Sequence, residues 1–203
     1  MDMTADSQPL KPLTFSQSTA PAFAVARNEA ERQRLKRAAQ AGLCERADRG
    51  LYLINAGRYS AFHEFAAIAV RRPETVICLE SAAAFHDLTT APPVPIHIGI
   101  PRRAHAPRWN WPPVEAITLD LNPAIGGIET HEIEGIPVRI TSVARTIAEC
   151  LAHPKIVTPN AFQEILWTMW RKKKAKTDQI QEFSKHFGVD AEMSLYLRTL
   201  QGP

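Results

Sequence analysis

Cysteine is scarce in this chain, and its placement excludes two common kinds of stabilisation. Cys44, Cys78 and Cys150 are far apart, and each lies among apolar residues. A disulfide framework uses an even set of cysteines, and a structural zinc site uses paired ligands. The cysteine usage therefore excludes both, and it predicts a protein of the reducing cytoplasm.

Long hydrophobic runs are missing as well. No stretch approaches the roughly 20 apolar residues that a membrane-spanning helix needs. The N-terminal stretch MDMTADSQPLKPLTF contains acidic residues and no apolar core of the kind that directs secretion. We therefore expect neither a membrane partner nor export.

The motifs of the common enzyme classes are also absent from the sequence. There is no HExxH spacing, no glycine-rich phosphate loop, no Gly-x-Ser-x-Gly elbow and no evident group of carboxylates for a catalytic metal. His86 is expected to be a structural residue at a helix end. Arg145 and Glu149 are four residues apart on a predicted helix, which favours a local ion pair. The sequence therefore predicts no catalytic residue, no metal and no cofactor.

Basic residues are present in two concentrations, although the net charge is only +3. Residues 27–58 contain eight arginines and lysines against four acidic residues, and residues 171–176 contain five basic residues in six positions. Apolar residues form 45% of the chain and charged residues 22%, which is typical of a globular protein. The distribution of charge is thus more informative than its sum.

The first basic concentration has the outline of a recognition helix followed by a wing. Asn28 is a favourable N-cap with Glu31 three residues later, and Gly42 stands where a helix C-cap glycine belongs. Residues 43–46 and 51–54 then predict two strands joined by a turn that Gly50 closes. The order of these elements favours a nucleic-acid-binding module.

Two interpretations of this module are open. In the first, Arg32 and Lys36 lie on one helical face and contact nucleic acid together with Arg46 and Arg49 of the wing. In the second, the helix is only a solvated amphipathic helix with local ion pairs. A helix-turn-helix also needs a positioning helix, and only residues 20–26, which include Pro21, are available for it. The module is therefore expected to be truncated.

The rest of the chain predicts an α+β fold, in which mixed strands and helices are followed by a helical tail. We expect a flexible tail over residues 1–22, a winged-helix-like module over 23–57 with a boundary near 56–59, and a larger domain over 58–203. Helices are expected over 59–71, 80–88, 142–151, 159–174, 177–187 and 190–200. Strands are expected over 75–79, 96–100, 114–119, 128–133 and 136–140.

Two further regions are candidates for a secondary contact with nucleic acid or a partner. The loop over residues 101–113 combines arginines with tryptophans, a pattern that either stacks on bases or pins a loop to the core. The second basic concentration either contacts a partner or is the solvated end of a helix. The candidate residues are Arg102, Arg103, Arg108, Trp109, Lys172, Lys173 and Lys174.

Four stretches, taken in order and with their spacing, resemble the AbiE-type (AbiEi) antitoxin family of bacterial type IV toxin–antitoxin and abortive-infection systems. Together they span residues 35–151, and they are LKRAAQAGLCERADRGLYLI, VICLESAAAFHDL, PIHIGIPR and GIPVRITSVARTIAECL. The resemblance implies a transcriptional autorepressor whose N-terminal winged helix binds operator DNA. It also implies that the second domain counteracts a nucleotidyltransferase-like toxin, without a stable complex being required.

Carried over to this chain, the resemblance assigns DNA contacts and no catalytic residue. It places Arg32, Arg34, Lys36 and Arg37 on the recognition helix, and Arg46 and Arg49 in the wing. The chain departs from the family pattern at the N-terminus, where the first helix is poorly matched. The alternative function is a non-catalytic protein- or RNA-interaction protein in which the winged helix is a remnant.

Overall fold

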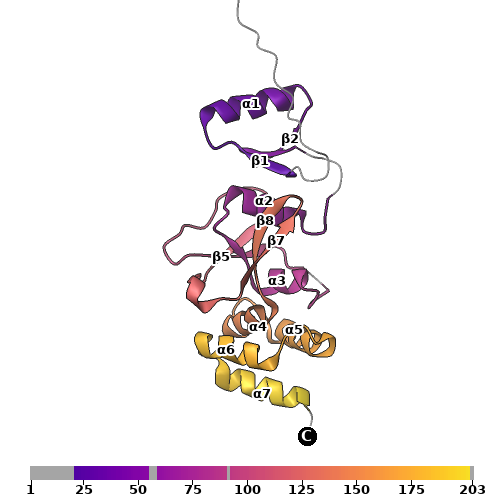
Figure 1. Cartoon of the computed structure of the whole chain (residues 1–203), viewed down its shortest axis with the longest axis vertical. Coiled ribbons are helices and arrows are strands. Elements are labelled where there is room, and N and C mark those ends of the chain that lie inside the picture. The colour runs from indigo at the N-terminus through magenta and orange to yellow at the C-terminus, as the bar shows by residue number, and fades with distance from the viewer. Residues whose placement is uncertain (1–20, 55–58, 91, 202–203) are drawn as a thin grey trace, which may run out of the picture.

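The computed structural model describes residues 21–54, 59–90 and 92–201, and these residues form an α+β fold as predicted. Figure 1 shows three parts along the long axis of the molecule: a small sheet with helix α1, a larger sheet, and a group of helices at the C-terminal end. The predicted boundary at 56–59 and the tail over 1–22 fall largely outside the described residues. Among the described residues, no helix is long and apolar enough to cross a membrane.

The N-terminal part contains the predicted helix and hairpin. Strands β1 (Phe23–Val25), β2 (Glu45–Asp48) and β3 (Leu51–Leu53) form an antiparallel sheet in the order β1-β3-β2, and α1 (Glu29–Gln40) connects β1 to β2. The side chain of Asn28 accepts a hydrogen bond from the Glu31 amide at 2.8 Å, so it caps the helix as expected. Gly42 ends it with a φ of 71°.

The run over residues 20–26 is not the positioning helix of a helix-turn-helix. Its centre is strand β1, in which Phe23 pairs with Leu53 of β3. In the part of the chain that the structure describes, no helix precedes α1, and α1 has no fully buried residue. Leu35, Ala38 and Ala39, predicted to face a core, are therefore only half-buried.

The larger sheet is mixed and has the strand order β6-β5-β4-β8-β7. Pairs β5–β6 and β4–β8 are parallel, whereas β4–β5 and β7–β8 are antiparallel. The strands are β4 (Val76–Ile77), β5 (Ile96–Ile100), β6 (Val114–Thr118), β7 (Ile128–Ile133) and β8 (Ile136–Thr141).

Helices cover both faces of this sheet. Isoleucines of β5 and β8 pack with α2 (His63–Arg71) and with the small N-terminal sheet in one hydrophobic cluster. Ile117 and Leu119 pack on the other side with the remaining helices. Those helices are α3 (Leu79–Phe85), α4 (Val143–Ala152), α5 (Pro159–Lys172), α6 (Thr177–Phe187) and α7 (Asp190–Gln201).

Strand β5 shows how coverage of the second face is achieved. Its alternating sequence places three isoleucines on one face and His97 and Gly99 on the other, yet all five residues are buried. A side chain at Gly99 would put its Cβ 2.6 Å from Cδ1 of Leu119. The absence of a side chain therefore lets Leu119 pack directly against the strand.

Three predicted elements of the larger domain had wrong boundaries. Helix α2 begins at His63 rather than at residue 59, because the Ser60 amide donates to Oε1 of Glu134 at 2.7 Å and the chain turns there. Strand β4 has only two residues, because helix α3 already begins at Leu79. Helix α3 ends at Phe85, three residues before its predicted end. The other predicted elements of the larger domain match within two residues.

Glu134 also connects the N-terminal part to the larger sheet. It lies in the β7–β8 turn, its Oε2 is 2.7 Å from Nδ1 of His63, and its backbone carbonyl accepts from the Ala22 amide at 3.0 Å. Phe23 and Leu51 belong to the same cluster as the isoleucines of β5 and β8. The N-terminal sheet therefore packs on the hydrophobic core that it shares with α2.

Gly127 is predicted to be intolerant of any side chain. Its φ is 69°, and an added Cβ would lie 2.5 Å from Cζ of Phe183 and 2.9 Å from Cδ of Arg145. Gly126 has nearly the same φ of 71° but has nothing within 4 Å of an added Cβ, so it serves as the control of similar φ without the close contact. We expect Gly127→Ala to lower the free energy of unfolding by about 1–3 kcal/mol more than Gly126→Ala does. Urea unfolding measures the difference, and equal losses would contradict the close packing.

Candidate functional site

A groove of about 1060 Å³ opens among α1, the β2–β3 hairpin and the loop over residues 101–113. We call it the basic groove, because the charged side chains among its described lining residues are six cations and a single carboxylate, Asp48. The cations come from four segments that are separate in sequence: Arg32 and Lys36 from α1, Arg46 and Arg49 from the hairpin, Arg71 from α2, and Arg108 from the loop. Such convergence of charge is suited to a phosphate-bearing ligand.

Helix α1 presents one face to the basic groove. The lining residues of α1 are Arg32, Lys36, Ala39 and Gln40, and their spacing of four, three and one places them on the same side of an α-helix. Arg34 lies on the opposite side, and Arg37 is also outside the lining. Of the six predicted DNA contacts, the structure therefore brings Arg32, Lys36, Arg46 and Arg49 together.

The positive charge of the groove is largely uncompensated. In the described residues, Lys36, Arg46, Arg49 and Arg108 have no carboxylate within ion-pair distance. Arg32 contacts Glu29 at 2.6 Å, but both side chains are exposed, and such a pair is weak in water. The groove thus keeps cations available for a ligand.

Asp48, the one acidic residue of the groove, is neutralised by Arg71. The Arg71 guanidinium donates to Oδ2 of Asp48 at 2.8 Å, and both side chains are less than a tenth exposed. Burial favours a raised pKa for Asp48, but the hydrogen bond and charge of Arg71 and hydrogen bonds from backbone groups outweigh it, and its pKa is lowered. Asp48 is therefore ionised and paired at neutral pH.

Arg71 is the residue of this site that sequence reasoning missed. It also donates to the backbone carbonyl of Trp111 at 3.0 Å, and its guanidinium carbon lies 4.9 Å from the centre of the Trp109 ring. Its hydrogen-bond partners Asp48 and Trp111 are 23 and 40 residues away from it in sequence. A charged residue in the last turn of an apolar helix is normally just exposed to solvent. Nothing in the local sequence therefore indicated that Arg71 belongs to this site.

The loop over residues 101–113 is pinned to the core by its tryptophans, one of the two interpretations that the sequence left open. Trp109 donates from Nε1 to the Pro112 carbonyl at 2.8 Å, and the Trp111 ring lies 6.0 Å from that of Phe23. Both indoles are half-buried. Arg108 lines the basic groove, while Arg102 and Arg103 are exposed outside it.

The lysine tract belongs to a different part of the molecule. Helix α5 ends at Lys172, and Lys173 follows in the left-handed conformation with a φ of 51°. Lys172 donates to the Asp87 carbonyl at 2.8 Å, and Lys174 is 3.6 Å from the Asp87 carboxylate. None of these lysines lines the basic groove. Helix α1, which lines that groove, lies far from α5 in Figure 1. Arg171 and Lys172 are therefore the basic last turn of α5, and the other lysines of the tract follow it.

His86, which the sequence predicts to be a structural residue, lies at the end of α3 beside strand β8. Nε2 of His86, at the end of α3, is 2.7 Å from the Thr141 carbonyl oxygen, as expected of a helix-end residue. Burial lowers the pKa of His86 and the hydrogen bond to Thr141 raises it; the effect of burial is larger, so the pKa is lowered overall. Across the described residues, no group of three or more histidine, cysteine, aspartate or glutamate side chains is arranged to hold a metal ion.

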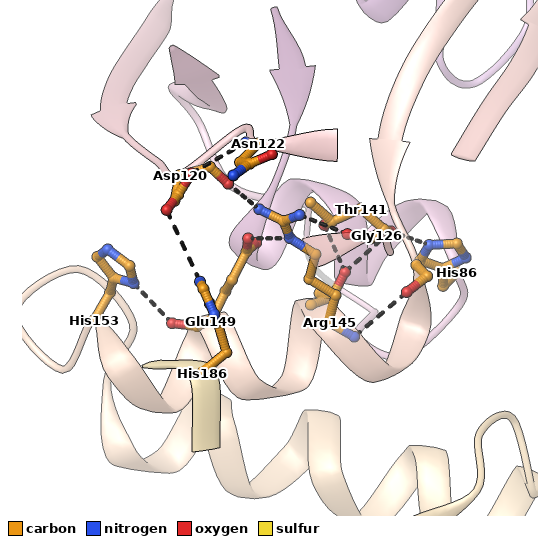
Figure 2. Close-up of polar contacts among 11 residues, drawn as sticks. His86, Asp120, Asn122, Gly126, Thr141, Arg145, Glu149, His153 and His186 are labelled. Carbon is orange, nitrogen blue, oxygen red and sulfur yellow. Dashed lines mark hydrogen bonds and ion pairs between the residues drawn. The ribbon is translucent and has the colours of Figure 1, made fainter. Parts of the chain in front are cut away.

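The predicted pair of Arg145 and Glu149 is present, but it is fully buried rather than on a solvated helix face. Figure 2 shows the Arg145 guanidinium pointing toward Glu149, Gly126 and Asp120. Its Nε donates to Oε1 of Glu149 at 2.8 Å, and its two terminal nitrogens donate to the Gly126 and Asp120 carbonyls, each at 2.7 Å. Oε2 of Glu149 is buried and has no hydrogen-bond partner among the described residues. The pair therefore holds the β6–β7 connection against α4.

Removing one member of this pair is expected to be more harmful than removing both. Arg145→Met leaves the acid group of Glu149 buried without its counter-ion and hydrogen-bond donor, which costs about 3–5 kcal/mol of stability. The double variant Arg145→Met with Glu149→Leu removes that buried polar group as well, so it should be less destabilised than the single variant. Chemical denaturation of the three proteins measures this order, and the reverse order would contradict the role of the pair.

The stability of the protein should depend on pH through Glu149. Burial raises the pKa of Glu149 from 4.5 to about 7, against the charge and hydrogen bond of Arg145 that lower it. The folded state therefore binds this proton more tightly than the unfolded state, so the contribution of Glu149 to the free energy of unfolding falls as pH rises from 4.5 to about 7. Denaturation at several pH values measures this. Glu149→Gln should remove that decrease, and an unchanged pH profile in the variant would refute the prediction.

No model of a protein family matches this chain, and no curated protein matches it significantly. The candidate site therefore rests on its own geometry, namely the six cations of the basic groove and the neutralised carboxylate among them.

Proposed function

We propose that this protein is a DNA-binding regulator that holds the sugar–phosphate backbone in the basic groove. The observation that carries the proposal is the convergence of cations on one concavity, where five line the groove besides Arg71, and Arg71 is already paired with the one carboxylate among the described lining residues. Phosphate contacts from arginine and lysine supply most of the affinity of proteins for DNA. Helix α1 and the hairpin, which contribute four of these cations, have the order of a recognition helix and a wing.

Within this proposal, the protein acts in the cytoplasm as the antitoxin and autoregulator of a type IV toxin–antitoxin system. The four stretches that resemble the AbiEi family support this role. The DNA is then the protein's own promoter, and the functional partner is a nucleotidyltransferase-like toxin that the larger domain counteracts. No catalytic residue, metal or cofactor is assigned to this chain.

One observation favours a second candidate, a non-catalytic protein- or RNA-interaction protein. Helix α1 has no fully buried residue and no preceding helix among the described residues, so the usual support of a recognition helix is not seen. In that case the winged part is a remnant without affinity for DNA. Co-purification with the product of a neighbouring gene, together with no DNA binding at low salt, would favour it.

The DNA-binding proposal predicts that charge inside the groove matters more than charge outside it. We expect Lys36→Ala with Arg46→Ala to weaken binding to DNA from upstream of the protein's own gene, because two phosphate contacts are lost. The slope of log affinity against log salt should become shallower by about 2. Electrophoretic mobility shifts at several salt concentrations measure both quantities.

The matched control is Arg34→Ala with Arg37→Ala, which removes two cations from the same module but from outside the groove. Its affinity and salt slope should stay close to those of the unchanged protein. A larger loss in the control than in the groove variant would assign DNA binding to the outer face of α1. No binding by the unchanged protein at low salt would overturn the proposed function itself.

A further inference from the structure

We propose that the loop over residues 101–113 is a third DNA-contacting element, in which Arg108 binds a backbone phosphate and Arg71 is the positioning residue. This inference rests on the proposed function and extends the interface beyond the winged part of the chain. A recognition helix and a wing do not require a contact from the following domain. Here that domain supplies a wall of the same groove.

The accessibility and charge of Arg108 carry the first half of the inference. Its side chain is exposed, it lines the groove that Lys36 and Arg46 also line, and no carboxylate of the described residues lies within ion-pair distance of it. A backbone strand held by α1 and the hairpin would therefore lie beside a free guanidinium group. Arginine in such a position favours phosphate, because its planar donors match the phosphate oxygens.

The anchoring of the loop explains why Arg108 is held there. The indole N–H of Trp109 donates a hydrogen bond to the Pro112 carbonyl, and the Arg71 guanidinium lies over the Trp109 ring. Trp111 packs near Phe23 of β1, and its carbonyl accepts from Arg71. A cation on a rigid segment loses less conformational entropy on binding than one on a free loop.

Arg71 holds two walls of the groove at once. On the hairpin side it donates to the Asp48 carboxylate at 2.8 Å and approaches the Arg49 carbonyl at 3.4 Å. On the loop side it binds the Trp111 carbonyl and covers the Trp109 ring. With its donors engaged in this way and its side chain 7% exposed, Arg71 is not a phosphate ligand. It sets the position of Arg108 relative to Arg46 and Arg49.

Arg108→Ala, compared with Arg103→Ala, tests the phosphate contact. Both variants remove one exposed arginine from the same loop, but only Arg108 lines the groove. We expect Arg108→Ala to weaken DNA binding roughly three- to tenfold at moderate salt and to make the salt slope shallower by about 1. Arg103→Ala should change neither. Equal effects of the two variants would overturn the assignment of Arg108.

A double-variant cycle tests the role of Arg71. If Arg71 positions Arg108, then Arg108→Ala should cost little further affinity in an Arg71→Met background, because the contact is already lost. If Arg71 only stabilises the fold, the two losses in affinity should multiply, and that result would overturn the positioning role. Thermal unfolding of each variant checks that binding is measured on folded protein. Arg71→Lys is the milder variant should Arg71→Met fail to fold.

The outcomes separate this inference from the proposed function. In one outcome, Lys36→Ala with Arg46→Ala weakens DNA binding but Arg108→Ala does not. The protein would then still be a DNA-binding regulator, but the loop over residues 101–113 would not be part of its DNA interface. The absence of any DNA binding by the unchanged protein would remove both. A weakened Arg108→Ala variant with an unaffected Arg103→Ala variant would support the extended interface.

Discussion

The packing of the larger sheet against the helical tail depends on how the buried guanidinium of Arg145 is satisfied. A charge removed from water is costly unless its donors are engaged and a counter-ion is near. Glu149 and the Gly126 and Asp120 carbonyls meet that requirement, so the β6–β7 connection must take the path that presents those carbonyls. The same packing requires glycine at position 127, because a Cβ there would collide with Arg145 and with Phe183 of α6.

Arg71, in the N-terminal half of the molecule, also connects segments that are distant in sequence. Arg71 joins the hairpin to the loop over residues 101–113, and it pairs with the only acid of the basic groove. In both cases one guanidinium group binds a carboxylate and backbone carbonyls from segments distant in sequence. The two arginines differ in their surroundings. Arg145 is fully buried in the core, whereas Arg71 lies at the wall of the basic groove beside cations that have no carboxylate partner among the described residues.

The position of the basic groove is related to how helix α1 is supported. Helix α1 is not supported by a helix bundle within the described residues, and the face that it presents to the groove carries Arg32, Lys36 and Gln40 beside Ala39. The groove beside α1 is therefore open and carries positive charge. The hydrophobic support of the small sheet comes from α2 and the β7–β8 turn, through Phe23, Leu51 and the contacts of Glu134.

The sequence by itself determined the elements that depend on local chemistry. The cap at Asn28, the stop at Gly42, the hairpin and the α+β class follow from propensities and hydrophobic periodicity within short windows. Tertiary structure alone decided the late start of α2, the burial of Arg145 and the place of Arg71, because each depends on a partner far along the chain. Tertiary structure also decided which candidate cations line the basic groove. Packing brings Arg108 to the groove and leaves Arg34, Arg37, Arg102 and Arg103 outside it.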